Sequence, residues 1–213
     1  MNDMYVTADL HLGHSQNQHG FGGIIHHANR PFSCIEEHDQ FLIAQWNKTV
    51  GQKDTIYILG DFAWRNHNHY IGGLRGKKIM ITGSHDKMNQ DSIRLFTEYH
   101  EGMLVRTLNK IPFVLTHCAM LVWERSHYGA INLHGHSHQR LEEHDAIRRM
   151  DVGVDGAIDY TPWSLDFIIY KMELKTNQED HKRYTRSEEE LNMIVFKNKT
   201  NNARMFAKYK TTT

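Results

Sequence analysis

Short apolar segments recur along the chain, and each is too brief to form a helix of ordinary length. They are rich in Ile, Val, Tyr and Phe, and most are bounded by polar or turn-forming residues, which is the pattern of β-strands. The segments that we predict as strands are residues 4–8, 55–59, 78–81, 112–115, 131–133 and 167–172. Some are apolar at consecutive positions, as is typical of strands buried on both faces.

Helical patterns separate several of these segments. Ser33 and Glu36 have the spacing of a capping box, and the apolar residues after them follow one helical stripe, so we predict a helix of about 15 residues that begins near this box. Weaker patterns predict helices over residues 66–74 and 91–99. Strands that alternate with helices predict an α/β layered fold.

The composition changes near the end of the chain. Residues 1–173 contain all of the predicted strands, whereas residues 174–213 are polar and carry Lys and Arg without an acid from residue 191 onward. We therefore expect one domain over 1–173 and a polar, partly helical appendage over 174–213, with its helix near residues 188–196. A solvated tail is the plain interpretation of the appendage, and an arm that contacts phosphate or a partner is the alternative.

Composition excludes some classes of protein and indicates another. The 213 residues balance 25 Lys and Arg against 25 Asp and Glu, so no overall charge marks a nucleic-acid coat or a membrane-surface protein. Cysteines are scarce, no apolar run reaches the length of a membrane span, and the first residues do not resemble a signal peptide. We expect a cytoplasmic protein without membrane contact, in a host's cytoplasm if a phage encodes it. The 17 histidines indicate metal binding, because imidazole is a common ligand of transition metals.

Histidine and aspartate gather where the predicted strands end. The first five strands run in turn into the sequences ADLHLGH, LGDF, TGSHD, LTHC and HGHSH. In open α/β sheets ligands bind beyond the carboxyl ends of the strands, so these side chains should converge. Each motif alone is more often a turn or a polar loop. Five in succession, each after an apolar run, predict a metal site.

The last motif places three histidines at alternate positions. Because alternate side chains of an extended segment point to one face, His134, His136 and His138 should share a face. We interpret His134 as a structural histidine beside the two others. Cys118, which follows the histidine of the fourth motif, is interpreted as a small buried hydrophobic residue.

In their order, these motifs resemble those of the calcineurin-like metallophosphoesterases: Asp-x-His, Gly-Asp, Gly-Asn-His-Asp/Glu, a single His, and Gly-His-x-His. The resemblance spans about residues 4–172. It is strongest for the small bacterial and phage members, to which the segments NRPF (29–32) and VGVDGAIDYTPWSLD (152–166) are also similar. It implies an α/β fold of two mixed β-sheets packed as a sandwich and flanked by helices, the four-layer fold of that family, and homodimerisation as a family habit.

The resemblance also implies a set of metal ligands. They are Asp9, His11 and His138 for one ion, His117 and His136 for a second ion, and Asp61 as the bridge between them. Such carboxylate and imidazole ligands suit Mn²⁺ first, with Ni²⁺, Co²⁺, Fe²⁺ or Zn²⁺ as alternatives. Ser84 stands where the family has an asparagine that binds the second ion, and since a serine hydroxyl is a poorer donor we expect a weaker second site.

By the same resemblance, a hydroxide that bridges the two ions would attack the phosphorus of a phosphate ester. His85 would stabilise the phosphoryl oxygens or protonate the leaving oxygen, and Asp86 would orient the ring of His85. On the substrate side we expect contacts from His14 and from Arg30, whose guanidinium can bind phosphate bidentately. Trp64 is a candidate to stack on a nucleotide, although packing tryptophans are commoner.

The expected function is thus a metal-dependent phosphoesterase, whose substrate is a small phosphodiester or phosphomonoester, with a nucleotide or cyclic nucleotide favoured. One alternative is a catalytically weakened binding or scaffold protein of the same fold. The serine at position 84, in place of the family's asparagine, favours this alternative. The other is a nuclease whose basic tail guides a strand, which would bind nucleic acid with a steep dependence on salt.

Overall fold

The computed structural model describes residues 2–15, 22–144 and 147–175. Within these ranges the strands are β1 (Met4–Thr7), β2 (Thr55–Leu59), β3 (Lys77–Ile81), β4 (Glu98–His100), β5 (Met103–Leu108), β6 (Ile111–Thr116), β7 (Ile131–His134), β8 (Arg149–Asp151) and β9 (Trp163–Ser164). The helices are α1 (Ile24–His27), α2 (Ile35–Thr49), α3 (His67–Gly73), α4 (Gln90–Ile93) and α5 (Leu165–Leu174). Short 3-10 turns lie at Ser126–Tyr128, Val154–Gly156 and Ile158–Tyr160.

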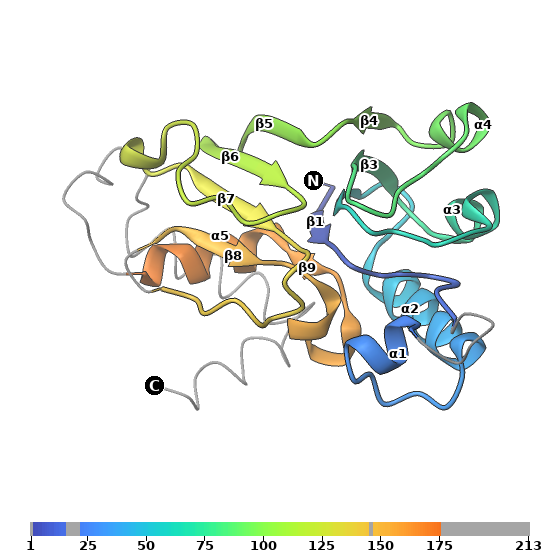
Figure 1. Ribbon diagram of the computed structural model, residues 1–213. Coiled ribbons are helices and arrows are strands. Elements are labelled where there is room, and N and C mark those ends of the chain that lie inside the picture. Colours follow the sequence, from blue (N-terminus) through green and yellow to red (C-terminus); the bar gives the residue numbers. More distant parts are fainter. Residues whose placement is uncertain (1, 16–21, 145–146, 176–213) are drawn as a thin grey trace.

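The strands form two mixed sheets (Figure 1). The first has the order β4-β3-β2-β1-β9, and its strands are parallel except for β9, which runs antiparallel to β1. The second has the order β5-β6-β7-β8, in which β5 is antiparallel to β6 and the other pairs are parallel. The prediction of an α/β protein with two mixed sheets is confirmed.

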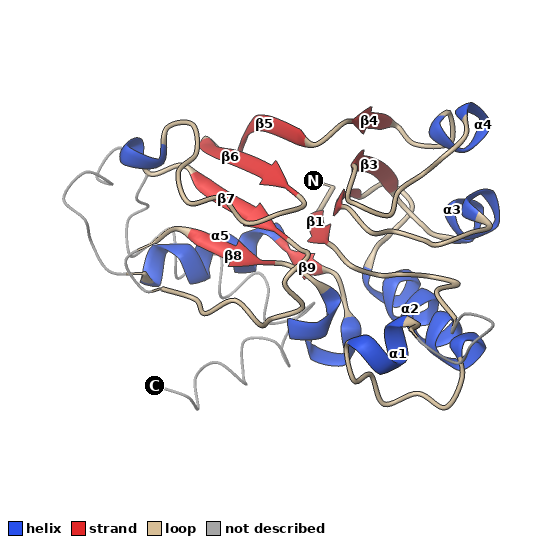
Figure 2. Ribbon diagram, viewed as in Figure 1, coloured by secondary structure: helices blue, strands red, loops and turns tan. Residues whose placement is uncertain are grey.

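Side-chain alternation divides the first sheet between two apolar cores. Val6 points to one face and packs in a cluster with Phe113 and Leu133 of the second sheet. Tyr5 points to the opposite face and packs with Trp46 of α2. The two sheets therefore share one core, which fixes the carboxyl ends of their parallel strands relative to each other. Figure 2 shows β6 and β7 directed toward the middle of the molecule.

Most of the predicted elements are present. Strands β1, β2, β3, β6 and β7 agree with the first five predicted segments to within one residue at each end, α2 is the predicted helix of 15 residues, and α3 is the predicted helix over 66–74. Strands β4, β5, β8 and β9 were not predicted. The N-terminal contact of α2 differs slightly, since Ser33 donates hydrogen bonds from its N and Oγ to Glu37 rather than to Glu36. The helix predicted over 91–99 is wrong in its second half, where β4 begins.

Residues 167–172 belong to α5, so the prediction of a strand there is wrong. The segment is apolar at most positions because much of the surface of α5 is buried, including Phe167 and Ile169. Such a run has no period that separates strand from helix. Ser164 caps the helix by accepting a hydrogen bond from Phe167 N at 3.5 Å.

The predicted helix near residues 188–196, like nearly all of the predicted appendage, lies outside the described residues. Among the parts of the chain that the structure describes, no helix combines the length and the apolar character needed to cross a bilayer.

Candidate metal centre

Side chains with metal-binding chemistry meet where the parallel strands of both sheets end. Asp9 and His11 follow β1, Asp61 follows β2, and His85 follows β3 in the first sheet. In the second sheet, His117 follows β6, and the chain after β7 carries His136 and His138. The structure thus brings together the residues that the sequence motifs singled out, from segments about 130 residues apart in the chain.

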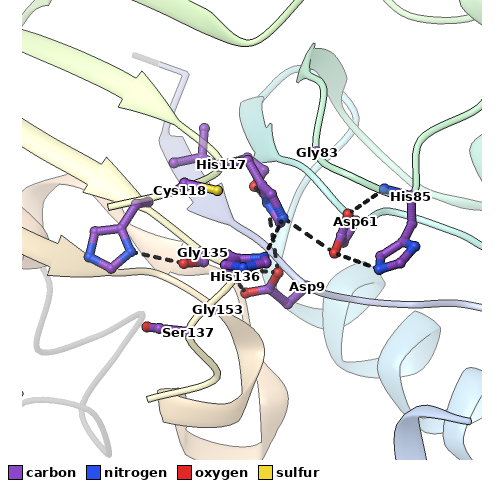
Figure 3. Close-up of polar contacts among 12 residues, drawn as sticks. Asp9, Asp61, Gly83, His85, His117, Cys118, Gly135, His136, Ser137 and Gly153 are labelled. Atoms are coloured by element: carbon purple, nitrogen blue, oxygen red, sulfur yellow. Dashed lines mark hydrogen bonds and ion pairs between the residues drawn. The ribbon is translucent and has the colours of Figure 1, made fainter. Parts of the chain in front are cut away.

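Three overlapping groups of these side chains have ligand atoms within 4.8 Å of one another. They are Asp9, His11 and His138; Asp9, Asp61 and His117; and His117, Cys118 and His136. Because the groups share Asp9 and His117, they form one continuous centre, of which Figure 3 shows Asp9, Asp61, His117, Cys118 and His136. The first group contains the three ligands expected for one ion, the second contains the expected bridge Asp61 beside His117, and the third contains a thiol to which the motifs assign no role.

Asp9 is fully buried beneath this centre. Its two carboxylate oxygens accept hydrogen bonds from His136 N at 3.0 and 2.8 Å. The chain passes so close that a Cβ on Gly135 would lie 2.6 Å from Asp9 Oδ2, which is why glycine precedes His136. Burial raises the pKa of Asp9 to about 7, since the charged carboxylate has too little compensation in this environment. A bound cation would supply that compensation, so Asp9 fits a metal ligand.

Asp61 faces several imidazoles. Its Oδ1 accepts a hydrogen bond from His85 N at 3.0 Å, while its Oδ2 lies 3.3 Å from His117 Nε2 and 3.5 Å from His11 Nε2. Burial acts to raise the pKa of Asp61, but the hydrogen bond and charge of His117 and the charge of His11 outweigh it and hold the pKa below its usual range. A carboxylate between imidazoles that belong to different groups is suited to a bridging position.

Two of the histidines are held in one tautomer by partners outside the centre. His117 donates from Nδ1 to Leu59 O at 2.9 Å, and His138 donates from Nδ1 to Asp155 Oδ2 at 2.7 Å. The remaining nitrogen, Nε2, is then the basic one that can coordinate a metal. His11 Nε2 is buried and has no hydrogen-bond partner among the described residues. An orphaned imidazole nitrogen of this kind fits a metal ligand, because buried polar atoms are otherwise nearly always paired.

The backbone of the centre is strained. Five of the predicted ligands have positive φ: Asp9 (57°), His11 (53°), Asp61 (51°), His136 (67°) and His138 (47°). Residues other than glycine rarely adopt this conformation, which costs roughly 1–3 kcal/mol at each position. Strain at this many converging side chains is typical of a functional site, where geometry is maintained at the expense of stability.

Asp86 does not orient the ring of His85, so that expectation is corrected. Its carboxylate is buried and accepts hydrogen bonds from three backbone N–H groups, those of Asp61 (2.7 Å), Phe62 (2.9 Å) and Gly83 (2.7 Å). Asp86 therefore fixes the loops that carry Asp61 and His85. The His85 side chain is 42% exposed, and its Nε2 lies 3.9 Å from Asp61 Oδ2, which leaves its ring open to an incoming molecule. Ser84 beside it is also exposed.

His14 and Trp64 form an aromatic wall next to the centre. Their rings are stacked, with centroids 4.2 Å apart and an angle of 4° between the planes, and Trp64 lies 5.0 Å from the ring of His85. The Trp64 side chain is exposed, so it does not pack in the core. His14 Nδ1 lies 3.2 Å from His11 Nδ1, which keeps His14 a candidate for contact with substrate.

Arg30 lies beneath the centre, so the expectation that it binds substrate is corrected. Its buried guanidinium donates to Asp9 O at 2.6 Å and Leu10 O at 3.0 Å, and it binds the carboxylate of Asp155 bidentately at 2.8 and 2.9 Å. With these donors engaged, Arg30 positions Asp155, which in turn holds His138. Sequence reasoning missed Asp155, because it lies in a 3-10 turn after a short strand without an apolar pattern.

His134 and Cys118 also differ from expectation in part. Strand β7 ends at His134, and the positive φ of His136 breaks the alternation, so the three histidines do not share a face. His134 is buried with its Nδ1 2.9 Å from Gly135 O, as a structural histidine would be. Cys118 is exposed, so the prediction that it is buried is wrong.

No family model matches the chain. Its relatives include the uncharacterized protein MJ1445 of Methanocaldococcus jannaschii, which is 31% identical over 183 residues that cover 81% of this chain and 93% of the relative. The Gene 66 proteins of Mycobacterium phages L5 and D29 are 28% and 27% identical over 73% and 76% of this chain, and 87% and 92% of their own lengths. The crystal structure of a protein of unknown function, AQ665 from Aquifex aeolicus, matches with a TM-score of 0.57 and 23% identity over 79% of this chain and 98% of that chain. This last likeness shows a shared fold.

Proposed function

We propose that this chain, which belongs to the family of the Methanocaldococcus jannaschii protein MJ1445, is a phosphoesterase. It hydrolyses small phosphate esters at a centre of two divalent cations. The observation that carries the proposal is the overlap of the Asp9–His11–His138 group with the Asp9–Asp61–His117 group at the ends of strands from both sheets. The two mixed sheets with a shared core agree with the four-layer fold of the calcineurin-like metallophosphoesterases, which the order of the motifs resembles.

The first cation would be held by Asp9, His11 and His138, and the second by His117 and His136, with Asp61 shared between them. Two cations in such a centre would supply positive charge that polarises a phosphoryl group and lowers the pKa of water. Mn²⁺ suits the carboxylate and imidazole donors of the first group, with Ni²⁺, Co²⁺, Fe²⁺ and Zn²⁺ as alternatives.

The remaining residues act on the ester. His85 is exposed beside Asp61 and can donate a hydrogen bond from Nε2 to a phosphoryl oxygen or a proton to the leaving oxygen. Trp64 presents an exposed indole, already stacked on His14, to whatever group the phosphate carries. An aromatic surface at this place favours a nucleotide or another aryl ester over an aliphatic one, because base stacking on aromatic side chains contributes about 1–3 kcal/mol.

The test uses the full chain, stripped of metal with a chelator and then reloaded with Mn²⁺. Hydrolysis of bis-p-nitrophenyl phosphate and of p-nitrophenyl phosphate should both be measured, since their ratio separates diesterase from monoesterase. We expect activity only with added metal. Asp61→Asn should lower it at least about 100-fold, because even outer partners of ligands contribute 10- to 100-fold. The matched control Asp91→Asn changes an exposed aspartate on α4 that belongs to none of the ligand groups, and it should leave activity unchanged.

Activity that persists in chelator, or that survives Asp61→Asn, would contradict the proposal. Metal binding without hydrolysis of either ester under any of the five cations would favour the scaffold alternative.

A further inference from the structure

The third group in the centre adds Cys118 to His117 and His136, the two ligands expected for the second ion, and the motifs assign no role to this thiol. The ring nitrogens of His117 and His136 lie 3.2 Å apart, and Cys118 Sγ is within 4.8 Å of both. Figure 3 shows the sulfur on the side of Cys118 that faces these two rings. A soft sulfur donor and two imidazoles so arranged are a typical set for a borderline transition metal.

The position of Cys118 is fixed by the backbone around it. Thr116 Oγ1 donates a hydrogen bond to Cys118 O at 2.8 Å, and Thr116 Oγ1 itself accepts one from Asn132 Nδ2 at 3.1 Å. On the other side, Gly135 N donates to His117 O at 2.9 Å, which ties the end of β6 to the loop that carries His136. The three donors therefore come from two adjacent strands that are joined where these residues begin.

The neighbouring part of the centre has a ligand atom without a partner in the described part of the chain, and Asp61 links it to this group. His11 Nε2 is buried without a hydrogen-bond partner among the described residues, and it points at Asp61 Oδ2 from 3.5 Å. The same carboxylate oxygen lies 3.3 Å from His117 Nε2. Asp61 Oδ2 thus lies between His11, an expected ligand of the first cation, and His117, an expected ligand of the second, so a second cation at Asp61 would lie beside the His117–Cys118–His136 group.

We infer that Cys118 is a ligand of the second cation and completes the site that Ser84 leaves one strong donor short. This inference rests on the proposed function. Asp61, His117, His136 and Cys118 then supply four donors, the number that Zn²⁺ takes in most protein sites. As the bond from Sγ to the cation forms, the thiol releases its proton to water. The thiolate makes Zn²⁺ and Co²⁺ better occupants of this position than Mn²⁺ or Mg²⁺, which prefer oxygen ligands.

Cobalt gives a readout that does not depend on activity. The metal-free full chain, kept reduced with a phosphine, is titrated with Co²⁺ and followed by absorption. A thiolate ligand produces a charge-transfer band in the near ultraviolet, separate from the visible bands of the bound ion. We expect this band in the unaltered protein and in Cys34→Ala, a matched control because Cys34 is also exposed and free but lies at the start of α2.

Cys118→Ala should lose the charge-transfer band and bind the second Co²⁺ at least about tenfold more weakly, because a direct ligand contributes no less than an outer partner does. A second measurement needs no substitution: Zn²⁺ should slow the alkylation of Cys118 by iodoacetamide and leave that of Cys34 unchanged.

The outcomes separate the two proposals. Visible cobalt bands without a charge-transfer band, or equal alkylation of Cys118 with and without Zn²⁺, overturn the role of Cys118 and leave the phosphoesterase standing. A charge-transfer band that survives Cys118→Ala overturns it as well. Absence of any bound Co²⁺ removes the phosphoesterase proposal and this inference together.

Discussion

The metal centre has two halves: Asp9, His11 and His138 form the first, and His117, Cys118 and His136 form the second. They are supported in different ways. Around Asp9 and His138 the supporting groups are buried: Arg30 binds Asp155 and the backbone below Asp9, and Asp155 holds the ring of His138. In the second half, His117 is buried and donates to Leu59 O, but His136 and Cys118 are exposed. The directions of Asp9 and His138 are thus fixed by buried hydrogen bonds, whereas His136 and Cys118 depend more on the cation that binds there.

This difference affects how each half responds to substitution. In the first half, a change below the ligands removes buried partners and should reduce the stability of the whole fold. In the second half, a change of an exposed donor should alter metal affinity and leave the fold intact. The next predictions test this contrast, beginning with the largest effect.

Arg30→Met should lower the free energy of unfolding by about 3–5 kcal/mol, because it leaves the largely buried Asp155 carboxylate without the guanidinium that it binds. Two backbone carbonyls, those of Asp9 and Leu10, lose a donor as well. Denaturant unfolding of the metal-free chain measures the change. The matched control is Arg94→Met. The Arg94 side chain is 77% exposed directly after α4, so this change should alter the free energy of unfolding by less than about 0.5 kcal/mol. Similar losses in the two variants would show that the network under Asp9 does not stabilise the first half.

Ser84→Asn should act on the second half alone. The amide oxygen is a better donor than the serine hydroxyl, so we expect the affinity for the second cation to rise about tenfold, the lower end of what a supporting group contributes. Hydrolysis at limiting metal should rise in parallel. The affinity for the first cation is the internal control, because its ligands do not involve Ser84. Calorimetric titration with Mn²⁺ resolves both, and unchanged second-site affinity would contradict the prediction.

The same contrast explains how much of the molecule could be predicted from the sequence. The strands that carry the ligands are buried on both faces, so β2 and β6 are continuous apolar runs that end in a conspicuous Asp or His. Short strands at the edges, such as β4 and β8, have mixed patterns and were missed. Residues 167–172 are apolar at most positions, a pattern that does not distinguish the buried helix α5 from a strand.

The site residues divide in a similar manner. Residues within the motifs, such as Asp9 and Asp61, could be named because their chemistry lies next to a strand end. The partner that fixes His138 could not, because Asp155 and Arg30 are 125 residues apart and meet only in the folded chain. The chemistry of Arg30 alone predicts a contact with phosphate, whereas its burial and its ion pair with Asp155 show that it stabilises the fold.

The smallest expected effect concerns the sheets that carry the two halves. Glu98 on β4 of the first sheet accepts hydrogen bonds from Arg106 on β5 of the second at 3.0 and 2.7 Å, and lies 3.0 Å from His100 Nε2. The hydrogen bonds of Arg106 and His100 lower the pKa of Glu98 to about 2. A lowered pKa means that the pair stabilises the fold above about pH 4.5 and that this contribution is lost as the pH falls toward 2.

Because the Glu98 side chain is 35% exposed, solvent screens the pair, and its contribution should stay below about 1 kcal/mol. Glu98→Gln should therefore lower the free energy of unfolding slightly at neutral pH, and the difference from the unaltered chain should shrink as the pH is lowered through that window. Both metal affinities should be unchanged, since the ligands are held by the shared core and by local hydrogen bonds rather than by this edge contact. A loss of affinity in Glu98→Gln would mean instead that the two halves of the centre depend on how the sheet edges are joined.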